Sequence, residues 1–210
     1  MAIEVLNQDE LIVSDFANKT VIICDLEGKV KMIFWDEDRL KRPCGIVSCD
    51  RKGVFYISDI TTNCIQVFSR YGSFRDTMAH EGDGDGEVLR PCFMARNSRG
   101  SIIIADNQNN RVQVYDKDGK YSHKFGQQGD ADGEFQHPRG IALDKSDNIF
   151  VTSDDKVQMF TPDGQFICRV DAAEDELNVP RGVVVTSDDP YKVIVTDSQN
   201  HRVVIFKQKK

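Results

Sequence analysis

The sequence has no apolar run that approaches the length of a membrane helix. Such a helix needs roughly 20 consecutive apolar residues, whereas the apolar runs here are far shorter, as in Ser101–Ala105. Helical periodicity is missing as well. The first residues, Met1–Val5, have neither the basic start nor the apolar core of a signal peptide. We therefore expect a chain without helices, without a secretion signal and without a membrane partner.

Clusters of metal-binding or nucleophilic residues are also missing. The six cysteines form no CxxC pair, and the four histidines show no HxH or HxxxH spacing. Zinc sites depend on such spacings, and no Gly-x-Ser-x-Gly nucleophile elbow is found. We therefore predict a protein that is not an enzyme and holds no metal or cofactor. Scattered cysteines favour a reducing compartment, the cytosol or nucleus, and we expect a cytoplasmic location.

The chain has little positive charge relative to negative charge. Lysine and arginine number 27 against 34 aspartates and glutamates, which gives a net charge of -7. This balance argues against a protein that binds any polyanion, and we expect no binding to DNA. It leaves room for a basic surface confined to one part of the molecule.

What the sequence does contain is a series of short apolar runs, each closed by a turn. In the stretch from Pro91 to Phe135, the runs are Met94–Arg96, Ser101–Ala105, Arg111–Tyr115 and Tyr121–Phe125. Runs of β-branched and aromatic residues bounded by Asn, Asp and Gly are typical of strands in an antiparallel meander. The stretch therefore predicts one unit of four strands.

This unit recurs along the chain at intervals of about 45 residues, which is the signature of a β-propeller with one blade per repeat. Four repeats begin at a proline, Pro43, Pro91, Pro138 or Pro180. We predict an all-β propeller, a single body with five repeats of four-stranded antiparallel blades. The blades are expected at residues 1–42, 43–90, 91–137, 138–179 and 180–210.

Blades 4 and 5 depart from the pattern. The loop Ser153–Lys156 is two residues shorter than its counterpart Asp106–Arg111, and blade 5 has only three strands. Unpaired sheet edges are costly, so we expect the five repeats to be part of a larger ring that has one further blade. An unclosed five-bladed ring, or a ring completed by another chain, is the alternative.

The repeat resembles the NHL repeat. The resemblance rests on Pro138–Asp144, on Ile149–Thr152 and on Asp197–Val203, the last of which contains the Asn-His-Arg core. It is strong in blades 3 to 5 and weaker in blades 1 and 2, where Asn18-Lys19 and Asn63-Cys64 replace the motif. The resemblance implies a six-bladed ring like the C-terminal NHL domain of tripartite-motif (TRIM-NHL) proteins. Some of those rings bind single-stranded or hairpin RNA and repress the messenger, and others bind proteins. No zinc-binding RING or B-box segment is present, so ligase activity is not expected.

One aspartate ends the second strand in four of the five blades. These residues are Asp15, Asp59, Asp106 and Asp197. They could form a ring of metal ligands, or each could cap the turn that follows it by accepting backbone N–H groups. We favour capping, together with ion pairs from Asp106 to Arg111 and from Asp197 to Arg202.

Two Gly-Asp loops, Gly82–Glu87 and Gly129–Glu134, suggest a calcium site at first sight. Neither loop provides the glycine and glutamate that an EF-hand loop needs at its sixth and twelfth positions. We interpret both as connections between blades, with Phe135 inserted into the core.

The candidate binding residues are the cations and amides of two loop classes that share one end of a propeller. One class flanks the blade-opening prolines and has Arg42 and Arg90 before the proline, and Arg139 and Arg181 after it. The other joins the second and third strands and carries Lys19, Asn63, Asn110, Lys156 and His201. Single-stranded RNA would use cations for phosphates and flat groups for bases, and Phe16 and Phe93 are the nearest aromatic rings. Pairing of Arg139 and Arg181 with Glu134 and Glu176 is an equally open reading.

Two functions follow from these observations. The first is a non-catalytic RNA-binding propeller that acts in post-transcriptional repression. The alternative is a protein-interaction scaffold that uses the same loops to recruit a partner or a substrate for a ubiquitin ligase.

Overall fold

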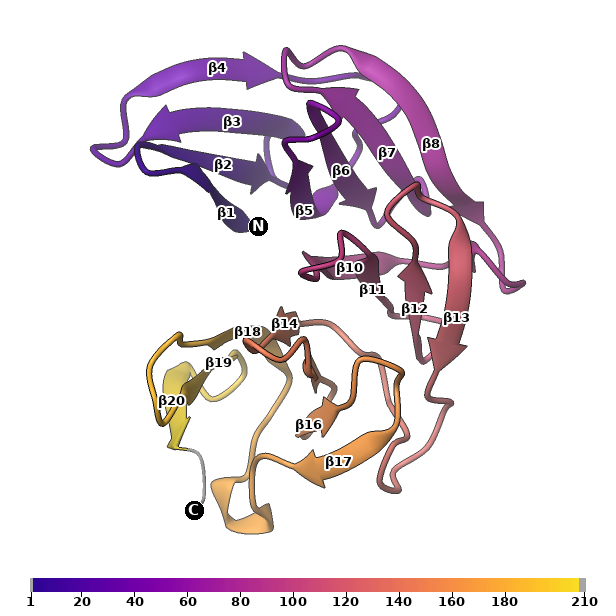
Figure 1. The fold of residues 1–210 in the computed structure, drawn as a ribbon, viewed down its shortest axis with the longest axis vertical. Coiled ribbons are helices and arrows are strands. Elements are labelled where there is room, and N and C mark those ends of the chain that lie inside the picture. The colour runs from indigo at the N-terminus through magenta and orange to yellow at the C-terminus, as the bar shows by residue number, and fades with distance from the viewer. Residues whose placement is uncertain (1, 208–210) are drawn as a thin grey trace. The chain divides into compact units, whose positions relative to one another are not determined.

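The computed structural model describes residues 2–207, and its regular elements are twenty β-strands and one short 3-10 helix, η1 (Ala173–Asp175). Among these residues no helix is long and apolar enough to cross a membrane. The strands form five sheets, called blades 1 to 5 in chain order. Strands that are neighbours in the sequence are neighbours in the sheet, which Figure 1 shows for β1 to β4. The prediction of an all-β fold of successive antiparallel sheets is confirmed.

The strand bounds follow the repeat. Blade 1 contains β1 (Ile3–Asn7), β2 (Glu10–Asp15), β3 (Thr20–Asp25) and β4 (Val30–Phe34). Blade 2 contains β5 (Pro43–Cys49), β6 (Val54–Asp59), β7 (Cys64–Ser69), β8 (Phe74–Glu81) and β9 (Glu87–Val88). Blade 3 contains β10 (Pro91–Arg96), β11 (Ile102–Asp106), β12 (Arg111–Tyr115) and β13 (Tyr121–Phe125). Blade 4 contains β14 (Ile141–Leu143), β15 (Ile149–Thr152), β16 (Val157–Phe160) and β17 (Phe166–Arg169). Blade 5 contains β18 (Pro180–Val185), β19 (Lys192–Asp197) and β20 (Arg202–Lys207).

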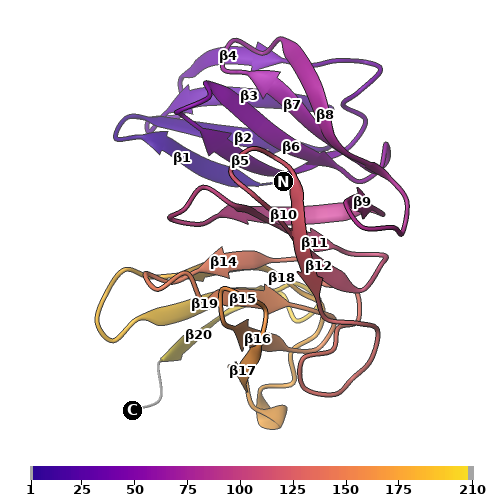
Figure 2. The ribbon, with the colours of Figure 1, turned by 45° about the vertical axis from the view of Figure 1, so that its right-hand side comes forward.

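Blade 2 differs from the prediction by one strand. The short strand β9, labelled in Figure 2, pairs with β8 in parallel, with His80 opposite Glu87 and Glu81 opposite Val88. It belongs to the Gly-Asp loop that connects blades 2 and 3. Blade 3 has a single parallel bridge at the same place, from Gln128 to Phe135, in the loop before β14. The end of each Gly-Asp loop therefore pairs in parallel with residues that precede the loop.

The chain forms two compact units, Met1–Met94 and Ala95–Lys210, which are called unit 1 and unit 2. The division falls within β10. In unit 1, blades 1 and 2 share one hydrophobic core, in which Phe34 of β4 lies against Phe55 and Phe68 with ring centroids 6.3 and 5.5 Å apart. The inward residues of β2 and β3, such as Ile12 and Val21, alternate with outward ones, as expected for a sheet with one buried face.

Unit 2 has an aromatic core around Phe160. Its ring centroid lies 4.9 Å from that of Phe125 and 5.3 Å from that of Phe135. The predicted insertion of Phe135 into the core is confirmed, because its side chain is fully buried. Phe125 also packs against Gly164 in the turn between β16 and β17, so this residue of blade 3 holds a turn of blade 4. A second cluster joins blades 4 and 5 through Phe150, Val193 and Val195.

Candidate recognition surface

The aspartate at the end of each second strand organises the loop that follows it. Oδ1 of Asp15 accepts the N–H groups of Ala17 and Asn18, both at 3.0 Å. Oδ1 of Asp59 accepts those of Thr61 and Thr62 at 2.9 and 3.0 Å. The predicted capping role is confirmed for both residues. Among residues 2–207, no group of three or more His, Cys, Asp or Glu side chains is placed to hold a metal ion.

The same aspartate also holds the segment that leads into the first strand of its blade. Oδ2 of Asp59 accepts the N–H groups of Lys41 and Arg42 at 2.7 and 2.6 Å. In unit 2, Oδ1 of Asp197 accepts the N–H of Asn178 at 2.8 Å, just before β18. One carboxylate thus joins the two loop classes that the sequence places at one end of a blade. We call this end the loop face of each unit.

Hydrogen bonding stabilises the charged form of these carboxylates. The backbone N–H and side chain of Asn18 hold the pKa of Asp15 below its usual value. Burial raises the pKa of Asp197, but the bonds from Asn178, Asn200 and Arg202 outweigh burial and leave that pKa lowered. Both aspartates are therefore carboxylates at neutral pH and are already occupied by neighbouring donors.

The residue that ends each of these loops has a left-handed backbone. Lys19, Asn63, Asn110 and His201 have φ values of 60°, 51°, 53° and 52°. Asparagine tolerates this conformation better than most residues do. In blade 4 the shorter loop has no such residue, and Lys156 directly precedes β16.

Each blade contacts the next through this loop, within both units. Oδ1 of Asn63 accepts the N–H of Arg90 at 2.8 Å, and Oδ1 of Asn110 accepts the N–H of His137 at 2.9 Å. In blade 1, Phe16 takes this place, and the guanidinium of Arg42 lies 4.4 Å from its ring centroid. The two loop classes are therefore side by side at these junctions.

The side-chain amides that were expected to contact bases already form hydrogen bonds within the protein. Nδ2 of Asn63 donates to Glu81 Oε1 at 2.9 Å, and Nδ2 of Asn110 donates to the carbonyl of Gln108 at 3.3 Å. Their oxygens accept the backbone bonds described above. Asn63 and Asn110 therefore hold the loops together, and a ligand would have to displace these bonds to reach them.

Unit 1 carries accessible cations on its loop face. Lys19, Arg42 and Arg90 are all exposed, and none of the three forms an ion pair among the described residues. Arg42 covers one face of the partly exposed Phe16 ring. Stacking of this kind fixes the guanidinium plane while leaving its charge available.

Three arginines on the loop face of unit 2 are paired with carboxylates. Arg111 and Arg202 pair with Asp106 and Asp197, each at 2.7 Å, as predicted. Arg139 pairs with Asp154, not with Glu134. Nδ1 of the neighbouring His137 donates to the other oxygen of the same carboxylate at 2.8 Å.

Arg181 and His201 remain exposed on unit 2, and Arg181 has no ion pair among the described residues. Glu176, the partner considered for Arg181, instead offers its backbone carbonyl to Nδ2 of Asn200 at 2.8 Å. The loop face of unit 2 therefore presents one unpaired arginine and one histidine.

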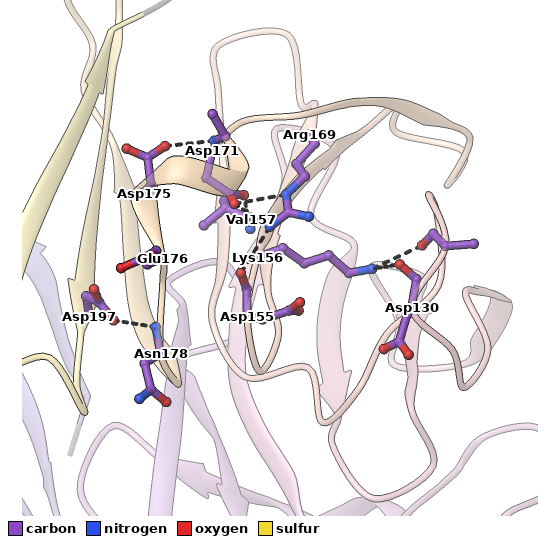
Figure 3. A network of polar contacts seen from close by, with 12 residues as sticks. Asp130, Asp155, Lys156, Val157, Arg169, Asp171, Asp175, Glu176, Asn178 and Asp197 are labelled. Atoms are coloured by element: carbon purple, nitrogen blue, oxygen red, sulfur yellow. Dashed lines mark hydrogen bonds and ion pairs between the residues drawn. The ribbon is translucent and has the colours of Figure 1, made fainter.

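Lys156 is buried, although the sequence placed it among the accessible residues. Figure 3 shows its ammonium group directed at the Gly-Asp loop, where Nζ donates to the carbonyls of Asp130 and Ala131 at 2.7 and 3.1 Å. The shortened loop of blade 4 lets this side chain turn inward. Lys156 is therefore a structural residue that ties blade 4 to the connection before it.

Blade 4 also replaces the missing capping aspartate. Ser153 stands at that position, and the cap comes from Asp171, whose Oδ1 accepts the N–H of Val157 at 2.7 Å (Figure 3). Arg169 pairs with the other oxygen of Asp171 at 2.7 Å. The sequence did not single out Asp171 or Asp154, and it did not assign His137 to this surface. His137 could have been found, because it precedes Pro138 as Arg90 precedes Pro91.

The two Gly-Asp loops are closed by their own glutamates. Oε2 of Glu87 accepts the N–H of Gly84 at 3.0 Å, and Oε2 of Glu134 accepts that of Ala131 at 3.1 Å. Gln127 donates to the other oxygen of Glu134 and, with the N–H of Ala131, lowers its pKa. The glutamate of each Gly-Asp loop is therefore engaged within its own loop.

A cavity of about 300 Å³ lies at the other end of blades 4 and 5. It is lined by the β14–β15 turn, including Asp144 and Asn148, by the loop before β19, including Thr186 and Asp188, and by Met159 and Tyr191. Asp144 is engaged by the N–H groups of Ser146 and Asn148. The candidate residues of the loop face do not contribute to this cavity.

Comparison with known proteins supports a propeller. The family model DUF5128, described as a 6-bladed beta-propeller, matches residues 95–179. The search of curated proteins finds no match. The match to the family model agrees with the expected larger ring of six blades.

Solved structures agree with this fold. Catalytically inactive virginiamycin B lyase from Staphylococcus aureus, solved with quinupristin, is 17% identical, with a TM-score of 0.69 over 98% of this chain and 69% of that one. A streptogramin B lyase is 14% identical, with a TM-score of 0.71 over 100% and 69%. A chain of a nidogen/laminin complex is 16% identical, with a TM-score of 0.72 over 95% and 76%. At these identities the likeness extends to the β-propeller fold.

Proposed function

We propose that this propeller chain is a recognition module that binds single-stranded RNA through the loop face of unit 1. The observation that carries the proposal is the stack of Arg42 on Phe16, with Lys19 and Arg90 also exposed and not ion-paired. In a chain of net charge -7, accessible cations beside an aromatic ring are a local exception.

The chemistry of this surface suits an unpaired nucleic acid strand. Cations that are free of carboxylates neutralise phosphates, and arginine and aromatic planes stack on bases. Capping by Asp59 fixes the backbone at Arg42, so that this cation is positioned before a ligand arrives. A cytoplasmic role in messenger repression is the part of the proposal that rests on the resemblance to NHL proteins.

The proposal is tested by fluorescence anisotropy with a labelled uridine-rich single strand and a hairpin at low salt. The double variant Arg42→Glu/Arg90→Glu is expected to bind at least about tenfold more weakly, because phosphate contacts dominate such affinity. Phe16→Ala is expected to lose about 1–3 kcal/mol, the value of one stacked base. The control is Arg99→Glu, which changes the charge of an exposed arginine between β10 and β11.

Absence of binding by the wild type, or equal losses in Arg99→Glu and the double variant, would overturn this proposal. Circular dichroism of each variant shows whether the fold is kept.

Protein recognition is the second candidate, and unit 2 favours it. Apart from Arg181, its loop cations Arg111, Arg139, Lys156 and Arg202 are paired or buried, while Asp132, Asp155 and Glu174 are exposed carboxylates. Such a surface repels phosphates and suits a basic protein partner, as in recruitment by a ubiquitin ligase complex. A pull-down that survives nuclease treatment and is weakened by Asp155→Lys would support this function. A pull-down lost on nuclease treatment would exclude it.

A further inference from the structure

The cavity of about 300 Å³ in unit 2 lies between two loops that each join the first strand of a blade to the second. One loop, residues 144–148, connects β14 to β15, and the other, residues 186–191, connects β18 to β19. The second loop is the longest of the five connections of this class. Blades 4 and 5 both contribute lining residues, so the two walls of the cavity come from neighbouring blades.

The wall from blade 4 is fixed by hydrogen bonds within its loop and to blade 3. Besides accepting the N–H groups of Ser146 and Asn148, Asp144 accepts Nδ2 of Asn148 at its second oxygen, at 2.8 Å. The two oxygens of Asp147 accept the N–H and the hydroxyl of Ser98 at 3.0 and 2.6 Å. The loop therefore has one defined shape before any ligand arrives.

The wall from blade 5 is closed at its base and carries a tyrosine. The N–H of Thr186 donates to the carbonyl of Lys192, and the N–H of Lys192 donates to Oγ1 of Thr186, both at 2.9 Å. The Tyr191 ring packs edge-on against Phe150, with centroids 5.8 Å apart. Its hydroxyl donates to Sδ of Met159 at 3.8 Å. A hydroxyl that donates to a thioether keeps its oxygen lone pairs for a donor from a ligand.

The cavity has an excess of negative charge. Residues 144–148 and 186–192 contain four aspartates and two lysines. Asp144 and Asp188 line the cavity together with one lysine, Lys145. Asp188 is 61% exposed, and its distance of 3.7 Å from Lys192 is too long for a hydrogen bond. Burial raises the pKa of Tyr191, and the charge of Asp144 raises it further, so this charge acts on the hydroxyl.

We propose that this cavity binds a small organic cation, an ammonium or guanidinium group on a short apolar stem. Asp144 and Asp188 attract the charge, and the Tyr191 hydroxyl accepts a hydrogen bond from it. Met159 and the Tyr191 ring cover the stem. A metal ion is a poorer fit, because no three ligating side chains among residues 2–207 are placed to hold one.

A free amine and a lysine or arginine side chain of a partner protein both present this chemistry. The site lies within unit 2 and does not depend on RNA binding by the loop face of unit 1.

The test is an NMR titration of the isotope-labelled chain with butylammonium and with butylguanidinium, which copy the ends of lysine and arginine side chains. The amide signals of residues 144–148 and 186–192 are expected to shift with saturation. Butanol has a similar size but no charge, and it is expected to leave these signals in place. This comparison uses the wild type, so it does not depend on whether a variant folds.

Variants identify the groups that hold the cation. Asp144→Asn and Asp188→Asn are each expected to weaken binding about threefold and together about tenfold, because the effects of separate groups add. Tyr191→Phe keeps the ring and is expected to weaken binding about fivefold through the lost hydrogen bond. Asp163→Asn removes an exposed carboxylate in the β16–β17 turn, outside the cavity, and is the control with unchanged affinity.

A Gly-Lys-Gly peptide with blocked ends distinguishes the two sources of the cation. Tighter binding of this peptide than of butylammonium assigns the site to a side chain of a partner protein, and weaker binding assigns it to a free amine. Three results would overturn the proposal. They are the absence of shifts with both cations, equal binding of butanol, and losses in Asp163→Asn that match those of the cavity variants. Circular dichroism shows whether each variant keeps its sheets.

Discussion

At the scale of the residue, two of the aspartates that end second strands form the same ion pair but differ in how exposed the pair is. Asp106 and Asp197 both pair with the arginine five positions later, at the same distance of 2.7 Å. Arg111 is 8% exposed, whereas Arg202 is 47% exposed. The energetic role of the two pairs therefore differs, because an uncompensated charge is far more costly when it is buried.

Asp106→Ala is expected to destabilise the protein by about 3–5 kcal/mol, because it leaves the guanidinium of Arg111 buried without its carboxylate. Asp197→Ala leaves the half-exposed guanidinium of Arg202, which water can solvate, and is expected to cost only about 1–2 kcal/mol. Urea unfolding followed by circular dichroism gives both values. Equal losses would contradict the assigned difference in burial.

Stability is also expected to depend on pH through Asp197. Its pKa is lowered in the folded state, while in the unfolded chain it returns to about 3.9. The stabilisation is therefore present above pH 4 and is lost as the pH falls through the folded pKa.

Unfolding free energies measured from neutral pH down to about pH 2 test this linkage. Asp197→Asn keeps the acceptor for Asn178 but cannot titrate, so its stability should decline less steeply than that of the wild type. Asp9→Asn, at an exposed carboxylate in the β1–β2 turn, is the control. Parallel curves for Asp197→Asn and the wild type would contradict the prediction.

The residues that the sequence assigned correctly have partners close by in the chain. Capping by Asp15 and Asp59 and the pairing of Arg111 and Arg202 take place within five positions, so the repeat itself shows them. Lys156 was misplaced because its carbonyl partners lie 25 and 26 positions earlier, in a loop of the preceding connection. No local pattern reveals such a partner.

At the scale of the element, the turns between third and fourth strands have the same backbone but different surroundings. Gly28 and Gly164 have φ values of 84° and 83°. Nothing lies within 4 Å of the place where a Cβ would stand at Gly28, whereas the ring of Phe125 occupies that place at Gly164. The turn at Gly28 has no neighbour at this position, and the turn at Gly164 is part of the packing between blades 3 and 4.

Both Gly28→Ala and Gly164→Ala are expected to lose about 1–2 kcal/mol, because alanine is strained in this conformation. Gly164→Ala should lose about 1–3 kcal/mol more, since the added methyl group overpacks the core. Thermal or urea unfolding measures the difference between the two variants. If Gly28→Ala and Gly164→Ala lose equal amounts of stability, the Phe125 ring moves aside without a cost in free energy, and the prediction is wrong.

Strands could be predicted where the alternation of apolar and polar residues, and the turn residues between strands, recur along the chain. The sequence predicted five successive antiparallel units and gave only three strands to the last, in agreement with the described residues. It missed β9, because Glu87–Val88 is too short for alternation and pairs in parallel through its backbone. It left open a pairing of Glu134 with Arg139, whereas that glutamate closes its own loop.

At the scale of the whole molecule, charge is distributed unevenly between the two units. Accessible cations are found on the loop face of unit 1, while unit 2 pairs most of its own with carboxylates. Net charge alone could not show this, because it counts paired and unpaired groups equally. A nucleic acid strand is therefore expected to find a small number of contacts in a protein that otherwise repels it.

The salt dependence of the proposed RNA binding would count those contacts. With Lys19, Arg42 and Arg90 on phosphates, the logarithm of the affinity should fall with the logarithm of salt concentration with a slope of about -2, at about 0.7 per contact. Arg90→Ala should reduce the slope by about 0.7. Arg181→Ala, an exposed arginine on unit 2, should leave it unchanged, and a slope near zero in the wild type would contradict the assignment.

The hydrogen bonds from Asn63 to Arg90 and from Asn110 to His137 each span 27 residues of chain. During synthesis at roughly 5–20 residues per second, either asparagine leaves the ribosome seconds before the backbone group it will bind. The loop between the second and third strands of a blade can therefore form this hydrogen bond only after the start of the next blade has been synthesised. We therefore expect the blades to be completed in the order of synthesis, each after the start of the next blade has been made.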